Sequence, residues 1–256
     1  MQNGNSYSDN KIAPHGVLPR YYDDMDQRRE VVDHFFDESA VHYDWITEMM
    51  SFGSGRWYRR QALVRAGVEQ GMTVLDSGAG TGVVSLLAKQ LVGDSGSVIS
   101  LDPSVGMLSE AVRRGVRQPI LGLGERLPIA DNSVDFVTMG YALRHVEDLT
   151  LLFKEYLRVL KPGGKILVLE ITAPKNKLGL MFLKWYLKYI VPLLTRIIRR
   201  STIAKELMKY YWDTIENCVP PEVILSAMRG AGAESADRHL VLGCFSEYLG
   251  VKKSES

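Results

Sequence analysis

The stretch TVLDSGAGTG, residues Thr73–Gly82, decides the fold of this chain. Its first three residues are β-prone and mostly apolar, as a buried parallel strand requires, and Asp76 closes that run. Gly78, Gly80 and Gly82 then let the backbone turn sharply and leave room for a ligand. Apolar residues recur at helical spacing over Val83–Val92. A strand, a glycine loop and a helix N-terminus in this order predict the cofactor-binding edge of an open, doubly wound α/β sheet.

The spacing of the three glycines bears on the kind of cofactor. A dinucleotide-binding fingerprint has the form G-x-G-x-x-G, whereas here the third glycine comes one place early and Val83 occupies the position of close helix packing. This spacing weakens the hypothesis of an NAD-dependent oxidoreductase without excluding it. A tight turn that binds no ligand is a second alternative at this point.

Length and composition indicate one large globular domain. The chain has 256 residues, 46% of them hydrophobic, and a formal net charge of +1, which suggests neither wholesale disorder nor nucleic-acid binding. Its two cysteines are too few and too far apart for a disulfide framework or a four-ligand zinc site, and we expect no metal. Residues 1–10 are polar and lack the pattern of a secretory signal, so we expect a cytoplasmic protein.

The remaining pattern predicts alternating strands and helices around the glycine loop. Further strands are expected at Ser97–Asp102, Pro119–Gly124, Phe136–Met139 and Lys165–Ile171, and a helix at Leu149–Leu160 that ends in the turn Lys161–Gly164. A helix ending at Gly230 and a hairpin formed by Ala233–His239 and Leu242–Tyr248 complete the chain. We divide it into a tail and helical cap (residues 1–70), a cofactor-binding core (71–172), a helical insertion (173–215) and a C-terminal part (216–256), all within one domain.

Three stretches carry a resemblance to known enzymes. The pattern [DE]-x-G-x-G-x-G at Asp76–Gly82 resembles the first motif of class I S-adenosylmethionine (SAM)-dependent methyltransferases, and the turn at Lys161–Gly164 is similar to their LKPGG turn. The stretch FFDESAVHYDWITEMMSFGSGRWYRR, residues 35–60, resembles the N-terminal signature of the UbiE-like ubiquinone/menaquinone C-methyltransferases. The resemblance implies a Rossmann-like sheet of seven strands, with an N-terminal helical cap and a helical lid, that binds SAM.

The resemblance also implies which residues hold the cofactor. Asp102 ends a strand where a carboxylate can accept both ribose hydroxyl hydrogens, although it could instead cap the next helix. The family usually carries an acidic residue at the position of Leu123, so the adenine contact would have to come from Gly124 or Glu125. The expected cofactor-binding residues are Asp76, Gly78, Gly80, Asp102, Met107, Gly124 and Glu125.

The expected catalytic residues are Arg144, His145 and Tyr43. UbiE-like enzymes carry Leu-Arg-Asn-Val after the fourth strand, and here His145 replaces the asparagine. An imidazole can take up a proton near neutral pH, whereas an amide cannot. The alternatives are a packing role for His145 and a surface salt bridge from Arg144 to the nearby acids, and Glu170 is a further candidate base.

The insertion is the part that bears on the acceptor. It is densely apolar over residues 178–198, and charged side chains interrupt it too often for it to span a bilayer. All the charges between residues 174 and 200 are basic, which suggests an interfacial surface or the lid of an apolar pocket, with a solvated helical insertion as the alternative. They are Lys175, Lys177, Lys184, Lys188, Arg196, Arg199 and Arg200.

These observations predict SAM-dependent C-methylation of a hydrophobic, isoprenoid small molecule. The acceptor could be a prenylated quinol, as in the UbiE-like enzymes, or a prenyl diphosphate such as farnesyl or geranyl diphosphate, with or without cyclisation. The diphosphate would need cations and aromatic rings, and the candidates are Arg59, Arg60, Arg196, Arg199, Arg200, Tyr210, Tyr211 and Trp212. A non-catalytic SAM-binding assembly subunit is an alternative of another class. The sequence is also compatible with peripheral contact of residues 178–200 with the inner membrane surface. It is compatible with a homodimer as well.

Overall fold

The computed structural model describes residues 11–24, 27–28, 31–32, 36–37, 53–174, 176–190 and 202–254. Within these ranges, the side chains of residues 187–188 and 202–208 are left undescribed.

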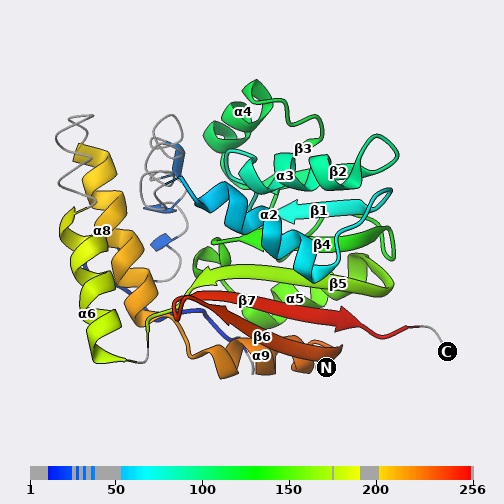
Figure 1. Cartoon of the computed structure of the whole chain (residues 1–256). Coiled ribbons are helices and arrows are strands. Elements are labelled where there is room, and N and C mark those ends of the chain that lie inside the picture. Colours follow the sequence, from blue (N-terminus) through cyan, green and yellow to red (C-terminus); the bar gives the residue numbers. More distant parts are fainter. Residues whose placement is uncertain are drawn as a thin grey trace, which may run out of the picture.

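A seven-stranded sheet forms the centre of the molecule, in the order β3-β2-β1-β4-β5-β7-β6. Figure 1 shows this sheet with helices packed along it. Strands β1 to β5 run parallel, and β7 is antiparallel to both β5 and β6. The strands are β1 (Thr73–Ser77), β2 (Ser97–Asp102), β3 (Pro119–Leu121), β4 (Val134–Gly140), β5 (Leu160–Ile171), β6 (Ala233–Val241) and β7 (Phe245–Lys252). The sequence-based prediction of a doubly wound seven-stranded sheet is confirmed.

Helices cover both faces of this sheet because each carries one apolar side. Helices α2 (Gly55–Ala66) and α3 (Val83–Val92) pack on one face, where Leu63 and Leu87 are buried. Helices α5 (Leu149–Val159) and α9 (Pro221–Gly230) pack on the other, together with Phe153 and Met228. Helix α4 (Val105–Arg113) and the 3-10 turn η1 (Leu143–His145) follow strands β2 and β4 and lie at their carboxyl ends.

The turn expected at Lys161–Gly164 is instead part of strand β5. Leu160 pairs with Val134, and the register then shifts so that Lys165 pairs with Phe136, which makes the intervening residues a bulge. Gly163 allows it with a φ of 76°. Strand β3 is also shorter than expected and ends at Leu121, because a tight turn closed by the bridge between Leu123 and Arg126 follows it.

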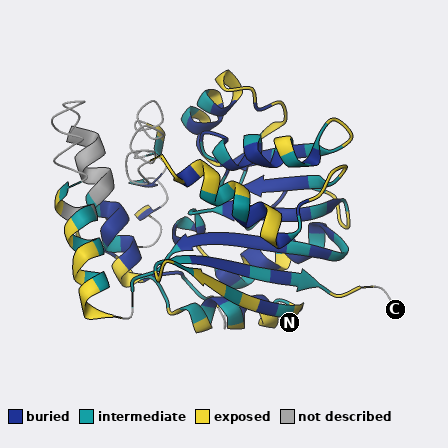
Figure 2. Cartoon of the chain, viewed as in Figure 1, coloured by how far each residue is buried: buried dark blue, intermediate teal, exposed yellow. Residues whose placement is uncertain are grey.

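The insertion forms a helical pair beside the sheet. Figure 1 shows helix α6 (Lys177–Trp185) lying against helix α8 (Thr202–Asn217), and the π-helical turn η2 (Tyr186–Ile190) follows α6 directly. The part of α8 whose side chains are described is mostly buried between Tyr210 and Ile215 (Figure 2), and Tyr210 and Trp212 are completely inaccessible to solvent. Among the residues that the structure describes, no helix is both long and apolar enough to cross a bilayer.

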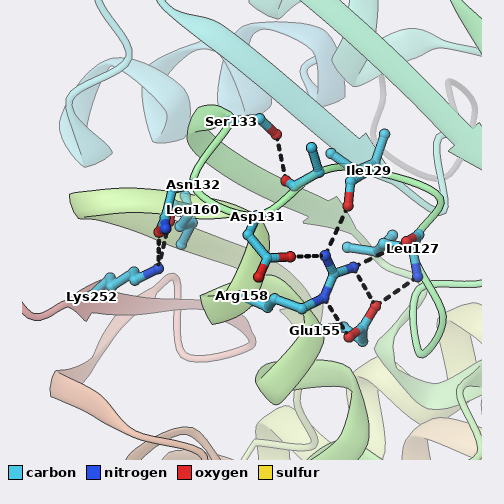
Figure 3. A network of polar contacts seen from close by, with 10 residues as sticks. Leu127, Ile129, Asp131, Asn132, Ser133, Glu155, Arg158, Leu160 and Lys252 are labelled. Atoms are coloured by element: carbon cyan, nitrogen blue, oxygen red, sulfur yellow. Dashed lines mark hydrogen bonds and ion pairs between the residues drawn. The ribbon is translucent and has the colours of Figure 1, made fainter.

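Arg158 on helix α5 holds the loop between β3 and β4 (Figure 3). Its guanidinium group donates hydrogen bonds to the carbonyl oxygens of Leu127, at 3.0 Å, and Ile129, at 2.8 Å. It also pairs with Asp131 at 2.6 Å and with Glu155 at 2.7 Å. These two carboxylates raise the pKa of Arg158. The planar side chain of Arg158 thus fixes the loop between β3 and β4. The first residues of this loop lie at the edge of the sheet where the glycine loop also lies.

We expect Arg158→Ala to lower the melting temperature by several degrees. The loop carbonyls and two carboxylates lose their partner, which should cost about 1–3 kcal/mol, and each kcal/mol corresponds to about 2–4 °C in a chain of this size. Thermal unfolding followed by circular dichroism measures the change. Arg113→Ala is the control, since Arg113 is exposed and contacts Glu110 at 3.3 Å on the same helix, where a salt bridge contributes little. Equal melting temperatures for the two variants would contradict the role of Arg158 in holding the loop between β3 and β4.

Candidate active site

A cavity lies at the carboxyl ends of strands β1, β2 and β4. Including solvent at its mouth it encloses about 1080 Å³, enough for a nucleotide-sized ligand. Both the strand ends and the N-terminal segment line it, and that segment contributes Arg28, Val32 and Phe36. It is the position where open α/β sheets bind their ligands.

The three glycines of the loop have different roles. A Cβ atom on Gly78 would come within 2.6 Å of the Cβ of Ala142, so glycine here lets the loop touch the segment after β4. A Cβ on Gly82 would lie 2.6 Å from Val116, so this glycine serves helix packing. A Cβ on Gly80 would meet nothing within 4 Å, although its φ of 55° is one that glycine favours. Gly80 therefore borders open space, and both Gly80 and Gly78 line the cavity.

Asp76 is a buried carboxylic acid directly before this loop. Its Oδ2 accepts a hydrogen bond of 2.6 Å from the Ser85 hydroxyl, which in turn accepts one of 2.7 Å from Ser100. Its Oδ1 is buried and has no hydrogen-bond partner among the described residues. Burial raises the pKa of Asp76 to about 7, helped by the charge of Asp102 and opposed by the Ser85 hydrogen bond and the charge of Arg59. Asp76 is 0% exposed and does not itself line the cavity, which is reached by the next residues, Ser77 and Gly78.

Asp102 organises the loop and the next helix together. Its Oδ2 accepts a hydrogen bond of 2.8 Å from the Gly80 backbone N–H, and its Oδ1 accepts one of 2.9 Å from the Ser104 N–H. A carboxylate oxygen has two lone pairs, so each can still accept a ligand hydroxyl. Met107 stands one turn into α4, is 2% exposed and lines the cavity. Asp102 and Met107, both expected from the sequence to bind the cofactor, thus line the same cavity.

The opposite wall of the cavity contains Leu123, Gly124 and Glu125. A Cβ on Gly124 would lie 2.7 Å from Leu152, so glycine is required there for packing. Glu125 Oε1 accepts a hydrogen bond of 2.7 Å from the Glu147 N–H and so joins this loop to the segment after η1. Burial raises the pKa of Glu125. The apolar side chain of Leu123 lines the cavity at the position where the family usually carries an acidic residue.

Arg144 follows β4 in the turn η1, directly before the cavity-lining His145; it is completely buried and does not itself line the cavity. Its Nε stands 3.4 Å from Oε1 of Glu170, which is 1% exposed, and its guanidinium group lies 4.8 Å from the centre of the Tyr211 ring. The alternative of a surface salt bridge to the nearby acids is therefore wrong. Burial raises the pKa of Glu170, and Arg144 opposes this shift.

Arg28 is a site residue that the sequence analysis missed. It is 2% exposed, donates a hydrogen bond of 2.6 Å to the Arg144 carbonyl and another of 3.0 Å to the Val146 carbonyl, and lines the cavity. It also contacts His15 at 3.2 Å. Nothing in the sequence indicated that Arg28 belongs to the site. It precedes the recognised motifs, and an isolated arginine in a helical segment is normally on the surface.

His145 lines the cavity and is surrounded by aromatic rings. Its ring stacks on Tyr210 with centroids 5.6 Å apart and meets Phe36 edge-on at 5.0 Å. Its Nδ1 lies 3.3 Å from the Tyr210 hydroxyl, and its Nε2 has no hydrogen-bond partner among the described residues. Burial and the charges of Arg144 and Arg28 hold the pKa of His145 well below its usual value, so the imidazole stays neutral.

The other expected acceptor residues are placed in different surroundings. The guanidinium group of Arg59 lies 4.8 Å from the centre of the Tyr141 ring, directly after the carboxyl end of β4, and Arg60 is exposed. Trp212 is buried between α6 and α8, where its indole N–H donates to Glu216 at 2.9 Å. Tyr43, Arg196, Arg199 and Arg200 lie outside the described residues.

Comparisons with known proteins agree with this geometry. The ubiE/COQ5 methyltransferase family matches residues 23–252. The chain is 32% identical to the "Ubiquinone/menaquinone biosynthesis C-methyltransferase UbiE" of Klebsiella pneumoniae (strain 342), over 89% of this chain and 92% of the relative. It is also 32% identical to the UbiE protein of Coxiella burnetii (strain Dugway 5J108-111), over 85% of this chain and 89% of the relative.

Solved structures share the fold at low sequence identity. A SAM-dependent methyltransferase of Thermotoga maritima, a possible histamine N-methyltransferase, superposes with a TM-score of 0.61 at 23% identity, over 86% of this chain and 99% of that one. Phosphoethanolamine N-methyltransferase 2 of Haemonchus contortus, in complex with SAM, gives 0.63 at 18% identity, over 89% and 60%. The chain belongs to the ubiE/COQ5 methyltransferase family and is a SAM-dependent methyltransferase.

Proposed function

We propose that this enzyme transfers a methyl group to a ring carbon of a prenylated quinol. The observation that carries the proposal is the pair of buried guanidinium groups beside His145, those of Arg28 and Arg144. A carbon ortho to a hydroxyl becomes a stronger nucleophile when the hydroxyl loses its proton, and buried positive charge stabilises the phenolate that results. Methylation of an alkene leaves a carbocation, which the same two charges would destabilise. The names of the UbiE relatives support the same acceptor.

The residues around the glycine loop fit SAM, which supplies an electrophilic methyl group on its sulfonium. Asp102 would accept the ribose hydroxyl hydrogens, and Met107 and Leu123 would contact the adenine faces. The charge of Asp76, one residue behind the cavity wall at Ser77, would attract the cationic amino-acid end. Arg59, whose charge acts on Asp76, would hold the carboxylate of that end, a different role from the diphosphate contact expected from the sequence.

His145 would receive the proton of the acceptor's hydroxyl group. When Nδ1–H donates to the Tyr210 oxygen, the Nε2 lone pair is left to accept that proton. Because burial and the two arginines disfavour the imidazolium, the proton would not remain on His145. His145 would thus pass the hydroxyl proton on to water at the mouth of the cavity, and the hydrogen of the methylated ring carbon would leave as a proton by the same route. The arginines would stabilise the phenolate.

A prenyl diphosphate is the second candidate acceptor. Its support is the group of aromatic rings around His145, formed by Phe36, Tyr210 and Tyr211, since such rings stabilise a carbocation. We rank it second because the guanidinium of Arg144 lies against the Tyr211 ring and occupies one of those faces.

Turnover with methyl-labelled SAM tests the proposal. We expect label in a demethylated prenyl quinol and none in farnesyl diphosphate; label in the diphosphate alone would overturn the acceptor assignment. Label in neither acceptor, with SAM still bound, would support a non-catalytic subunit instead. His145→Gln should lower kcat about 10²–10⁴-fold and leave the affinity for S-adenosylhomocysteine unchanged. The control is His239→Gln, an exposed histidine on β6.

Cofactor affinity should depend on the protonation of Asp76. Its pKa of about 7 means that the acid is largely protonated at pH 6 and ionised at pH 8. Only the ionised form attracts the cofactor's ammonium group, so the affinity for S-adenosylhomocysteine should rise about tenfold from pH 6 to pH 8. Isothermal titration calorimetry measures it, and Asp76→Asn should bind weakly without this pH dependence. If the affinity of the wild type for S-adenosylhomocysteine is constant from pH 6 to pH 8, Asp76 does not have this role.

A further inference from the structure

Helix α6 exposes a continuous row of large apolar side chains. Leu178, Met181, Phe182 and Trp185 are 75%, 64%, 64% and 52% exposed, and Tyr189 in η2 is 59% exposed. We call these five residues the outer stripe. At 3.6 residues per turn the four on α6 lie within an arc of about 100°. Figure 2 shows exposed residues along the side of α6 that faces away from α8.

The outer stripe is separate from the face that α6 uses to pack on the protein. Leu180 and Leu183 point to the other side and contact the cluster that contains Tyr210 and Trp212. Tyr186 also contacts this cluster and lies at the boundary of the two faces, where its ring stacks on Phe182 with centroids 6.4 Å apart. That inner face alone accounts for the attachment of α6 to α8. Scattered apolar residues on a surface need no explanation, but a row of this kind on one helix marks an interaction site.

The charge of the surrounding segment identifies what the outer stripe contacts. Between residues 174 and 200 the sequence has seven lysines and arginines and no acid, whereas the whole chain carries a net charge of only +1. Lys177 is exposed at the start of α6, and Lys184 pairs with Glu216 of α8 at 2.6 Å. A stripe of apolar and aromatic side chains with basic neighbours is typical of helices that lie in the interface of an anionic bilayer.

We propose that the outer stripe of α6 inserts into the surface of a bilayer that contains anionic lipids. A second copy of the chain is a poorer occupant, because a two-fold contact would place this basic segment against itself. The described helices include none that could cross the bilayer, so the contact would be peripheral. This proposal does not depend on the identity of the methyl acceptor. The outer stripe faces away from α8, whereas the side chains of the insertion that reach His145 come from α8.

Vesicle flotation of the full chain tests the proposal. The wild type should float with vesicles of phosphatidylcholine that contain one quarter phosphatidylglycerol, and much less with pure phosphatidylcholine. Binding should weaken in about 1 M salt, which shortens the screening length from ~10 Å to ~3 Å. Trp185→Ser should reduce the partition coefficient about tenfold or more, since a large apolar side chain leaves the interface. Phe182→Ser should act in the same direction.

Trp57→Ser is the matched control, because Trp57 is 66% exposed but lies on α2, away from the outer stripe. It should float like the wild type, and circular dichroism should show all three variants folded. The proposal is overturned if the wild type does not float, if it binds both kinds of vesicle equally, or if Trp57→Ser loses as much binding as Trp185→Ser. It is also overturned if analytical ultracentrifugation without vesicles shows a dimer that Trp185→Ser dissociates.

Discussion

The buried ion pair between Arg144 and Glu170 is the interaction on which the acceptor side of the site depends. A guanidinium group without solvent and without a partner would cost several kcal/mol, and Glu170 offsets part of that cost at 3.4 Å from the Arg144 Nε. The pair joins the turn after β4 to the end of β5. Arg28 then binds the carbonyl oxygens of the same turn and adds a second buried cation. The proposed chemistry follows from this excess of positive charge, which favours an anionic acceptor. Burial first, and then the charges of Arg144 and Arg28, hold the pKa of His145 low and keep it neutral.

A backbone contact brings the cofactor loop and this turn together. Gly78 and Ala142 approach so closely that a side chain on Gly78 would overlap the Ala142 methyl group, at 2.6 Å. Tyr141, directly before Ala142, adopts a φ of 63°, a conformation that costs energy in a residue other than glycine. The strain and the close contact lie where the ligand of the glycine loop would meet the acceptor, which is the place where a methyl group must pass between them.

The fold could be predicted largely from the sequence, because strand, glycine loop and helix follow one another with distinct patterns. The positions of β1, α3 and α9, and of the cavity-lining residues Asp102 and Met107, depend on such local signals. The bulge in β5 could not be predicted, since the register of Val134 and Leu160 is set by pairing between strands that are distant in the chain. Arg28 was missed because its burial depends on contacts with Arg144 and Val146, which are distant in the chain. Glu170, the buried partner of Arg144, was named only as a candidate base. Burial is a tertiary property, so pKa shifts such as that of Asp76 have no signature in the sequence.

The ionisation of a bound phenol tests most directly whether the buried arginines select the acceptor. A phenolic analogue of the demethylated quinol would be bound together with S-adenosylhomocysteine, and its phenolate absorbance would be followed as a function of pH. Our account predicts a phenol pKa at least about one unit below that of the free compound, and a smaller shift in Arg28→Met, which lacks one of the two charges. A pKa that stays at the free value, or rises as burial alone would cause, would contradict the claim that this site stabilises a phenolate.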